Sequence, residues 1–159
     1  MMNLLIDIGN SCSKVAISEN RKIIEDFRFI ELDTYKILDI INEYKIQNSA
    51  LSNVSTHNDK LKKILTENTS FYSFSNEIRI PFNCSYKLTD VGDDRLALMA
   101  AAHYDFPTEN VLVIDMGTCI TYDIKTSNNN YKAGGISPGL RMRIKSISDG
   151  AFKLNKITP

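Results

Sequence analysis

One short pattern occurs twice in this sequence, and it constrains the fold more than any other feature. Residues 4–10 read Leu-Leu-Ile-Asp-Ile-Gly-Asn, and residues 112–118 read Leu-Val-Ile-Asp-Met-Gly-Thr. Each copy is an apolar run typical of a buried strand, followed by an aspartate, a glycine turn and a second strand. Such a repeat indicates that the chain contains two duplicated structural units.

The sequence around the two copies predicts a mixed α/β protein. Apolar runs and alternating residues predict strands at 3–8, 13–18, 22–30, 50–54, 111–115 and 120–124, and short strands or connectors at 71–74 and 78–81. Apolar residues at helical spacing predict helices at 35–45, from 58 or 59 to 65, and from 93 or 94 to 103. Asp33 or Thr34 can cap the first helix, and Pro138 suits the first position of a last helix.

Charge and cysteine content exclude several classes of protein. The 159 residues carry 19 basic and 19 acidic side chains, so there is no net charge to attract nucleic acid or an anionic membrane. No apolar stretch reaches the roughly 18 residues of a membrane span, and Asp7 interrupts the run that a signal peptide would continue. Three separated cysteines and two histidines fit neither a disulfide framework nor a zinc site. We therefore expect a cytoplasmic protein without nucleic-acid or membrane partners.

The repeated Asp-x-Gly pattern suits the binding of phosphate and its counter-ion. Glycine lets backbone N–H groups approach a phosphate, and Asp7 and Asp115 can hold a cation that neutralises phosphate charge. Lys14 adds a point charge, and Asn10, Ser11 and Thr118 are neutral hydrogen-bonding groups. A single Asp-x-Gly is a common turn, but two copies on matched strands favour phosphate binding.

Two further motifs each allow two interpretations. Asp93 and Asp94 at the start of a helix can simply complement the helix dipole, or one can accept a proton from a hydroxyl while Arg95 binds a carboxylate. The glycine-dense residues 134–139 can form a loop before a helix, or bring backbone and a helix N-terminus close to a ligand.

Taken together, four motifs resemble those of the type III pantothenate kinase family, in the same order. They are Asp7-Ile8-Gly9-Asn10-Ser11 with Lys14, Val91-Gly92-Asp93-Asp94-Arg95-Leu96, Asp115-Met116-Gly117-Thr118 with Thr121 and Asp123, and Gly134-Gly135-Ile136-Ser137-Pro138-Gly139. The first and third motifs occur throughout the acetate and sugar kinase, Hsc70 and actin superfamily. The second and fourth motifs separate this family from its relatives.

The resemblance implies an α/β fold of duplicated ribonuclease H-like or actin-like lobes, with mixed sheets flanked by helices. The first lobe would span residues 1–106, including the Gly-x-Asp-Arg helix, and residues 107–159 would begin the second lobe. Family chains are longer, so the second lobe would be incomplete relative to the family. We expect residues 1–159 alone to bind adenine weakly or to have little activity.

The resemblance also implies an activity, which is the ATP-dependent phosphorylation of pantothenate to 4'-phosphopantothenate in coenzyme A biosynthesis. Asp94 would be the general base. Phosphates of ATP would contact Asp7, Ile8, Gly9, Asn10, Ser11, Cys12, Ser13, Lys14 and Thr118. Magnesium would lie near Asp7, and Asp115 would hold potassium or ammonium.

Pantothenate would bind at the second motif, according to the same resemblance. Gly92, Asp93, Asp94 and Arg95 would contact it, with Arg95 suited to its carboxylate. Tyr86 is a weaker candidate, because its spacing to Gly92 is not clearly that of the family. Family members are homodimers.

Two other functions remain open from the sequence. One is a different small-acid kinase of the same superfamily. The other is a non-catalytic regulatory protein of the Bvg accessory factor type. Zero net charge and the lack of a helix-turn-helix pattern argue against direct DNA binding. The presence of Asp7, Asp94, Arg95 and Asp115 argues for chemistry.

Overall fold

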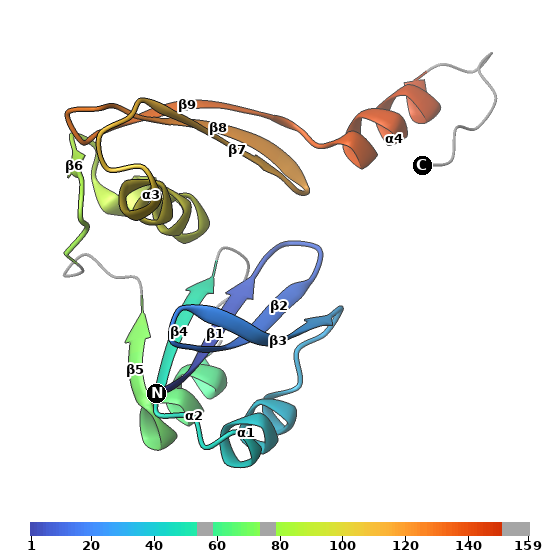
Figure 1. Cartoon of the computed structure of the whole chain (residues 1–159). Coiled ribbons are helices and arrows are strands. Elements are labelled where there is room, and N and C mark those ends of the chain that lie inside the picture. Colours follow the sequence, from blue (N-terminus) through green and yellow to red (C-terminus); the bar gives the residue numbers. More distant parts are fainter. Residues whose placement is uncertain (54–58, 74–78, 151–159) are drawn as a thin grey trace. The chain divides into compact units, whose positions relative to one another are not determined.

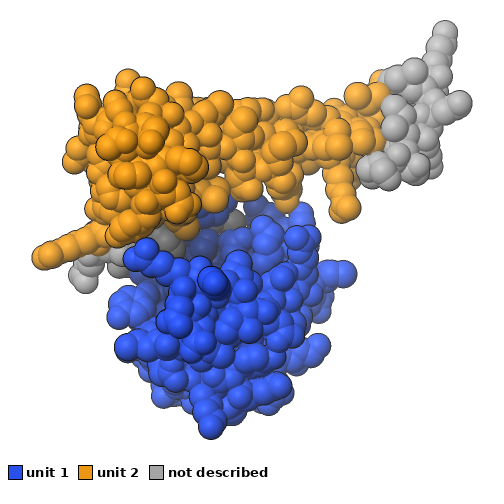
Figure 2. All heavy atoms as spheres, in the orientation of Figure 1, with its two compact units in different colours: residues 1–78, 92–94 blue, residues 79–91, 95–159 orange. Residues whose placement is uncertain are grey.

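The computed structural model describes residues 1–53, 59–73 and 79–150, which belong to two compact units (Figures 1 and 2). The first unit comprises residues 1–78 with 92–94, and the second comprises residues 79–91 with 95–159. The expected lobe boundary between residues 106 and 107 stays a prediction. In the described ranges, no helix combines the length and the apolar character that crossing a bilayer would require.

The first unit is a five-stranded mixed sheet with the strand order β3-β2-β1-β4-β5 (Figure 1). Its strands are β1 (Met2–Ile8), β2 (Ser13–Glu19), β3 (Lys22–Phe29), β4 (Asn48–Asn53) and β5 (Ser70–Ser73). The first three strands, each predicted from the sequence, form an antiparallel meander, whereas β4 runs parallel to β1 and β5 runs parallel to β4. Helix α1 (Thr34–Glu43) connects β3 to β4, and helix α2 (Asp59–Asn68) connects β4 to β5.

The core of the first unit follows from the alternation of its strands. Leu4, Ile6 and Ile8 point to one face of the sheet, because successive side chains of a strand alternate between faces. This face packs against the apolar sides of α1 and α2 in one cluster of buried aliphatic side chains. Helix α1 begins as predicted, since the Asp33 carboxylate accepts a hydrogen bond from the Tyr35 N–H at 2.9 Å.

The second unit contains a four-stranded sheet with the order β6-β9-β8-β7. Its strands are β6 (Asn83–Cys84), β7 (Val111–Met116), β8 (Cys119–Lys125) and β9 (Asn130–Pro138). A short 3-10 turn, η1 (Leu88–Asp90), precedes helix α3 (Asp93–Asp105), and helix α4 (Leu140–Gly150) follows β9. The sheets flanked by helices confirm the predicted mixed α/β class.

Two local predictions about residues 134–139 are wrong. Gly134 and Gly135 lie inside β9 rather than in a loop, and Pro138 ends that strand instead of beginning α4. The glycine is needed because the β8–β9 register shifts at this point, and a Cβ on Gly134 would collide with the carbonyl of Tyr122. Glycine in a strand can therefore reflect close backbone approach as well as a loop.

Some predicted ends fall outside the described residues. These are Val54, Asn58, Phe74 and Ile78. Residues 79–81, the described part of the short strand or connector expected at 78–81, contain no strand, which agrees with the connector. The short strand β6 follows at Asn83–Cys84 and pairs with β9.

Candidate active site

The first repeat copy forms a tight hairpin between β1 and β2. Residues 9–12 make the turn, and the Gly9 N–H donates to the Cys12 carbonyl at 3.2 Å. Asn10 and Ser11 are exposed at its tip. The geometry therefore presents a short backbone turn with two exposed polar side chains at its tip.

Asp7, the second-last residue of β1, is held from both neighbouring strands. The Ser52 hydroxyl on β4 donates to Asp7 Oδ1 at 3.1 Å, and Lys14 Nζ on β2 lies 3.4 Å from Oδ2. The Lys14–Asp7 pair is partly exposed, and ion pairs of this kind are weak, so Lys14 can turn toward a phosphate at little cost. Ser52 was missed by sequence reasoning, because only the parallel β1–β4 register places it beside Asp7.

The second repeat copy forms the corresponding hairpin between β7 and β8. Asp115 is again the second-last residue of its strand and lies opposite Thr121. The turn is shorter here, and the Gly117 N–H donates to the Cys119 carbonyl at 2.9 Å. The expected repeat of strand, aspartate and glycine turn is thus present in both units.

The fourth motif packs directly on this second turn. The Gly139 N–H donates to the Thr118 carbonyl at 3.0 Å, and its own carbonyl accepts from Arg143 N–H in the first turn of α4. A Cβ at position 139 would collide with the carbonyl oxygens of Gly117 and Thr118. The third and fourth motifs, which are separate in the sequence, therefore contact each other through their backbones. Glycine is needed at position 139 because this contact leaves no space for a Cβ.

The two acids at the start of α3 differ in their surroundings. Asp93 accepts a hydrogen bond from the Asn53 N–H, at the end of β4, at 3.3 Å. Burial raises the pKa of Asp93, and the neighbouring Asp94 carboxylate raises it further, while the hydrogen bond from Asn53 opposes the shift. Both acids lie in the first helical turn, where the dipole favours negative charge, so the simpler interpretation of this pair also stands.

Arg95 makes a bidentate pair with a carboxylate of the protein itself. Its Nε lies 2.8 Å from Asp123 Oδ2, and its Nη2 lies 2.5 Å from Oδ1. The Tyr131 hydroxyl donates to the same Oδ1 at 2.8 Å, and the Tyr86 ring meets the Tyr131 ring edge-on at 5.8 Å. The structure therefore brings together two predicted substrate residues, Tyr86 and Arg95, through Asp123 and Tyr131. Asp123 was named in the third motif without a role, and Tyr131 was not named in any motif.

The oxygen donors at the two hairpins fit the cations that the sequence implies. In the described part of the chain, no group of three histidine, cysteine or acidic residues gathers to form a complete metal cage. Magnesium is often bound by only one or two carboxylates together with phosphate and water oxygens. The Asp7 carboxylate beside the Ser52 hydroxyl matches this need, and the Asp115 carboxylate is an oxygen donor of the same kind.

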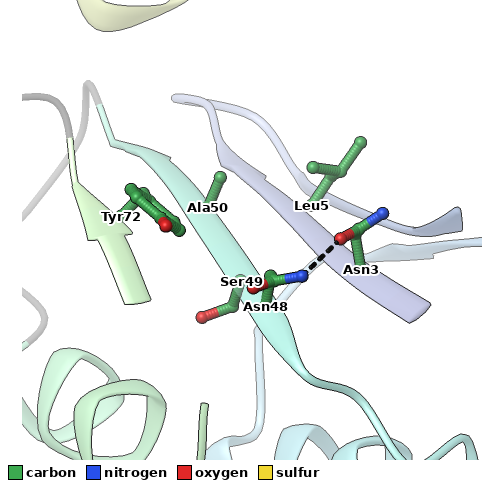
Figure 3. A pocket seen from close by; sticks show the side chains of 6 residues that line it. All are labelled: Asn3, Leu5, Asn48, Ser49, Ala50 and Tyr72. Atoms are coloured by element: carbon green, nitrogen blue, oxygen red, sulfur yellow. Dashed lines mark hydrogen bonds between the residues drawn. The ribbon is translucent and has the colours of Figure 1, made fainter. Parts of the chain in front are cut away.

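A pocket on the first sheet includes Leu5 and Ala50, which come two residues before Asp7 and Ser52 on the paired strands β1 and β4. It has a volume of about 320 Å³ and is lined by Asn3, Leu5, Asn48, Ser49, Ala50 and Tyr72 (Figure 3). The Asn48 amide donates to Asn3 Oδ1 at 2.9 Å along its wall. None of the six lining residues is charged, so the pocket is not suited to a polyphosphate.

Comparison with known proteins identifies consistent relatives. A family model described as type III pantothenate kinase matches residues 3–159. The type III pantothenate kinase of Christiangramia forsetii is 38% identical over 161 residues, covering 99% of this chain and 66% of the relative. That of Phocaeicola vulgatus is 36% identical over 160 residues, with the same coverage of 99% and 66%. The chain thus spans 66% of the length of these curated relatives.

Two solved structures share the fold. A Campylobacter jejuni crystal structure, described as a member of the Baf family of transcriptional activators, matches with a TM-score of 0.56 and 30% identity, over 96% of this chain and 62% of that one. An Aquifex aeolicus Ppx/GppA phosphatase matches with a TM-score of 0.50 over 98% of this chain and 57% of that one. At 15% identity, the second match concerns the fold alone.

Proposed function

The chain belongs to the type III pantothenate kinase family, and from this premise we propose that it phosphorylates pantothenate to 4'-phosphopantothenate with ATP, in coenzyme A biosynthesis. The observation that carries the proposal is the matched pair of hairpins, in which Asp7 and Asp115 each precede a glycine turn. Phosphoryl transfer requires alignment and charge neutralisation more than covalent chemistry. A turn with a carboxylate at its base meets both requirements.

In this proposal, the phosphates of ATP contact the first hairpin and Thr118. The hairpin residues are Asp7, Ile8, Gly9, Asn10, Ser11, Cys12, Ser13 and Lys14. Asp7 with Ser52 would hold magnesium, and Asp115 would hold potassium or ammonium. When bound, these cations neutralise the charge of the transferring phosphate. Lys14 would exchange its weak pairing with Asp7 for a phosphate oxygen.

Asp94 would act as the general base toward the primary hydroxyl of pantothenate. It need only orient the hydroxyl and accept its proton late in the reaction. Gly92, Asp93, Arg95 and Tyr86 would complete the contacts to pantothenate, with Arg95 directed to its carboxylate.

The test is a coupled kinase assay with pantothenate, with and without potassium, on this chain and on the full-length Christiangramia forsetii relative. We expect Asp94→Asn to reduce kcat by roughly 10²- to 10⁴-fold, as removal of a general base does. ATP binding, measured by calorimetry, should not change. The matched variant Asp93→Asn should reduce kcat much less.

Near-normal turnover in Asp94→Asn would show that another group accepts the proton. A larger loss in Asp93→Asn than in Asp94→Asn would transfer the base role to Asp93. If the unmodified chain and the relative both fail to phosphorylate pantothenate, the proposed activity is wrong.

We also propose that the protein works as a cytoplasmic homodimer. This part rests on family membership alone. Sedimentation equilibrium would test the dimer, and a monomer at micromolar concentration would contradict it.

A regulatory role is the second candidate function. The specific observation in its favour is the Campylobacter jejuni structure described as a Baf family transcriptional activator, which is 30% identical to this chain. Absence of turnover together with a stable protein partner would favour this role. Phosphorylation of a different small acid, with no activity on pantothenate, would instead indicate another kinase of the superfamily.

A further inference from the structure

We propose that Asp123 and Tyr131 are positioning residues, which together fix Arg95 and Tyr86 in the orientation that recognises the carboxylate of pantothenate. This inference rests on the proposed function, because it concerns how the same substrate is bound. It assigns a role to Asp123, which belongs to the third motif but received no role from it, and to Tyr131, which lies outside the four motifs. Three contacts connect these residues within the second unit. The Tyr86 ring packs against the Tyr131 ring, the Tyr131 hydroxyl donates a hydrogen bond to Asp123, and Asp123 forms an ion pair with Arg95.

The first part of the argument is the geometry of the Arg95–Asp123 pair. Both carboxylate oxygens of Asp123 are used, at 2.8 Å to Nε and 2.5 Å to Nη2. A bidentate pair of this kind fixes the plane of the guanidinium as well as its position.

Burial makes this pair suited to a fixed role. The Asp123 side chain is only 3% exposed and the Arg95 side chain 12%. Water therefore competes weakly for either group, and a charged arginine in such a place requires a charged partner. Asp123 allows Arg95 to remain in one orientation beneath the surface, whereas an exposed arginine would sample many rotamers.

Tyr131 joins this pair to Tyr86. Its hydroxyl donates to Asp123 Oδ1 at 2.8 Å, and its ring packs edge-on against both Phe82 and Tyr86, each at 5.8 Å. Burial, followed by the hydrogen bond to Asp123, raises the pKa of Tyr131, so the hydroxyl keeps its proton and remains a donor. Tyr86 itself is 43% exposed and can contact a ligand from outside.

The experiment separates carboxylate recognition from general stability. Pantothenate and pantothenol, in which an alcohol replaces the carboxylate, are titrated calorimetrically into the unmodified chain, Asp123→Asn and Tyr131→Phe. We expect Asp123→Asn to weaken pantothenate binding by about 10-fold, as the loss of one charge-assisted contact does, and to leave pantothenol binding unchanged. Tyr131→Phe, which keeps the ring contacts, should have the same selective effect at about 3-fold. Tyr104→Phe, at a tyrosine that is 68% exposed, is the matched control and should change neither affinity.

Each outcome decides the proposal. If a folded Asp123→Asn protein loses affinity equally for pantothenate and pantothenol, Asp123 has a merely structural role. If both affinities stay unchanged, Asp123 has no role in binding. If Asp123→Asn does not fold, the ratio of pantothenate affinity to pantothenol affinity in Tyr131→Phe decides instead. The Arg95 Nε–H resonance in NMR spectra should also shift in Tyr131→Phe, and in the unmodified chain when pantothenate is added. If the unmodified chain binds the acid and the alcohol equally, carboxylate recognition by Arg95 is wrong even where pantothenate is phosphorylated. If it binds neither and phosphorylates neither, the proposed function itself fails.

Discussion

The two units carry the same Asp-x-Gly hairpin and both bury apolar side chains, but they differ in the polar side chains that they bury. Among the described residues of the first unit, one cluster of 12 buried aliphatic side chains joins the sheet to α1 and α2, and the buried polar residues are serines. In the second unit, Asp123 and Lys125 are fully buried, whereas Leu112, Ile114 and Met116 on β7 are exposed. The shared hairpin therefore does not depend on how the rest of each unit is stabilised.

Lys125 illustrates the difference most clearly. Its side chain is inaccessible to solvent, and its ammonium donates to three backbone carbonyls, of Phe106 at 2.7 Å, Pro107 at 2.9 Å and Glu109 at 3.2 Å. These carbonyls lie just after α3, where a cation also complements the negative end of the helix. The second unit thus fixes the end of α3 with a charge, where the first unit uses aliphatic packing.

The largest expected effect comes from removing this ammonium. Lys125→Met should lower the free energy of unfolding of the chain by about 3–5 kcal/mol, because three carbonyls lose a hydrogen bond from a charged donor, a kind of bond that contributes about 1.5–3 kcal/mol. Leu51→Ala in the first unit should cost a similar 2–5 kcal/mol or so, through the lost transfer energy and the cavity. Urea denaturation followed by circular dichroism measures both values.

The control for this comparison is Lys132→Met, at an exposed lysine on the neighbouring strand β9, which should stay within about 0.5 kcal/mol of the unmodified chain. If Lys125→Met lowers the free energy of unfolding by less than about 1 kcal/mol, the buried ammonium does not stabilise the second unit. In that case, the three carbonyls must find water in the variant.

A smaller effect should distinguish two glycines, Gly9 in the turn of the first hairpin and Gly139, which packs on the turn of the second. Gly139→Ala places a Cβ against two backbone carbonyls of the second hairpin, so we expect a loss of about 1–3 kcal/mol. Gly9→Ala in the first hairpin meets only the Cys12 carbonyl at 3.2 Å and should cost less. Gly150→Ala, with nothing within 4 Å of its Cβ, is the control and should be neutral or stabilising. Equal losses at positions 9 and 139 would show that the packing of the fourth motif on the second turn contributes no stability.

The smallest effect concerns Asp93 and pH. Its pKa in the folded chain is raised above the ordinary 3.8, chiefly by burial, so the folded state holds this proton more tightly than the unfolded chain does. The contribution of Asp93 to stability is therefore fully present below the ordinary value, declines as pH rises through the raised pKa, and stays lost above it. Asp93→Asn should remove this decline in urea titrations between about pH 4 and pH 7.

The matched control is Asp90→Asn, at an exposed acid three residues earlier, and it should leave the pH profile of the unmodified chain unchanged. An identical decline in Asp93→Asn would assign the pH dependence to another group.

Local patterns predicted much of the fold and part of the candidate site. The apolar alternation of residues 3–8 and the helical spacing of residues 35–45 indicated elements that the structure confirms within two residues, because burial of one face imposes the period. The same reasoning failed at Gly134 and Gly135, where the strand continues through a register shift. A glycine pair signals close backbone approach and a loop equally well, and only the position of Tyr122 distinguishes the two.

What the sequence by itself determined is the repeated Asp-x-Gly hairpin and the order of its motifs, since these depend on residues adjacent in the chain. Tertiary structure alone decided that Ser52 supports Asp7 across 45 residues, and that Asp123 holds Arg95 across 28. Partners so far apart in sequence meet only through strand register and the placing of a helix on a sheet. The physical reason is that hydrogen-bond partners of buried charges are chosen by proximity after folding, and no local period encodes them.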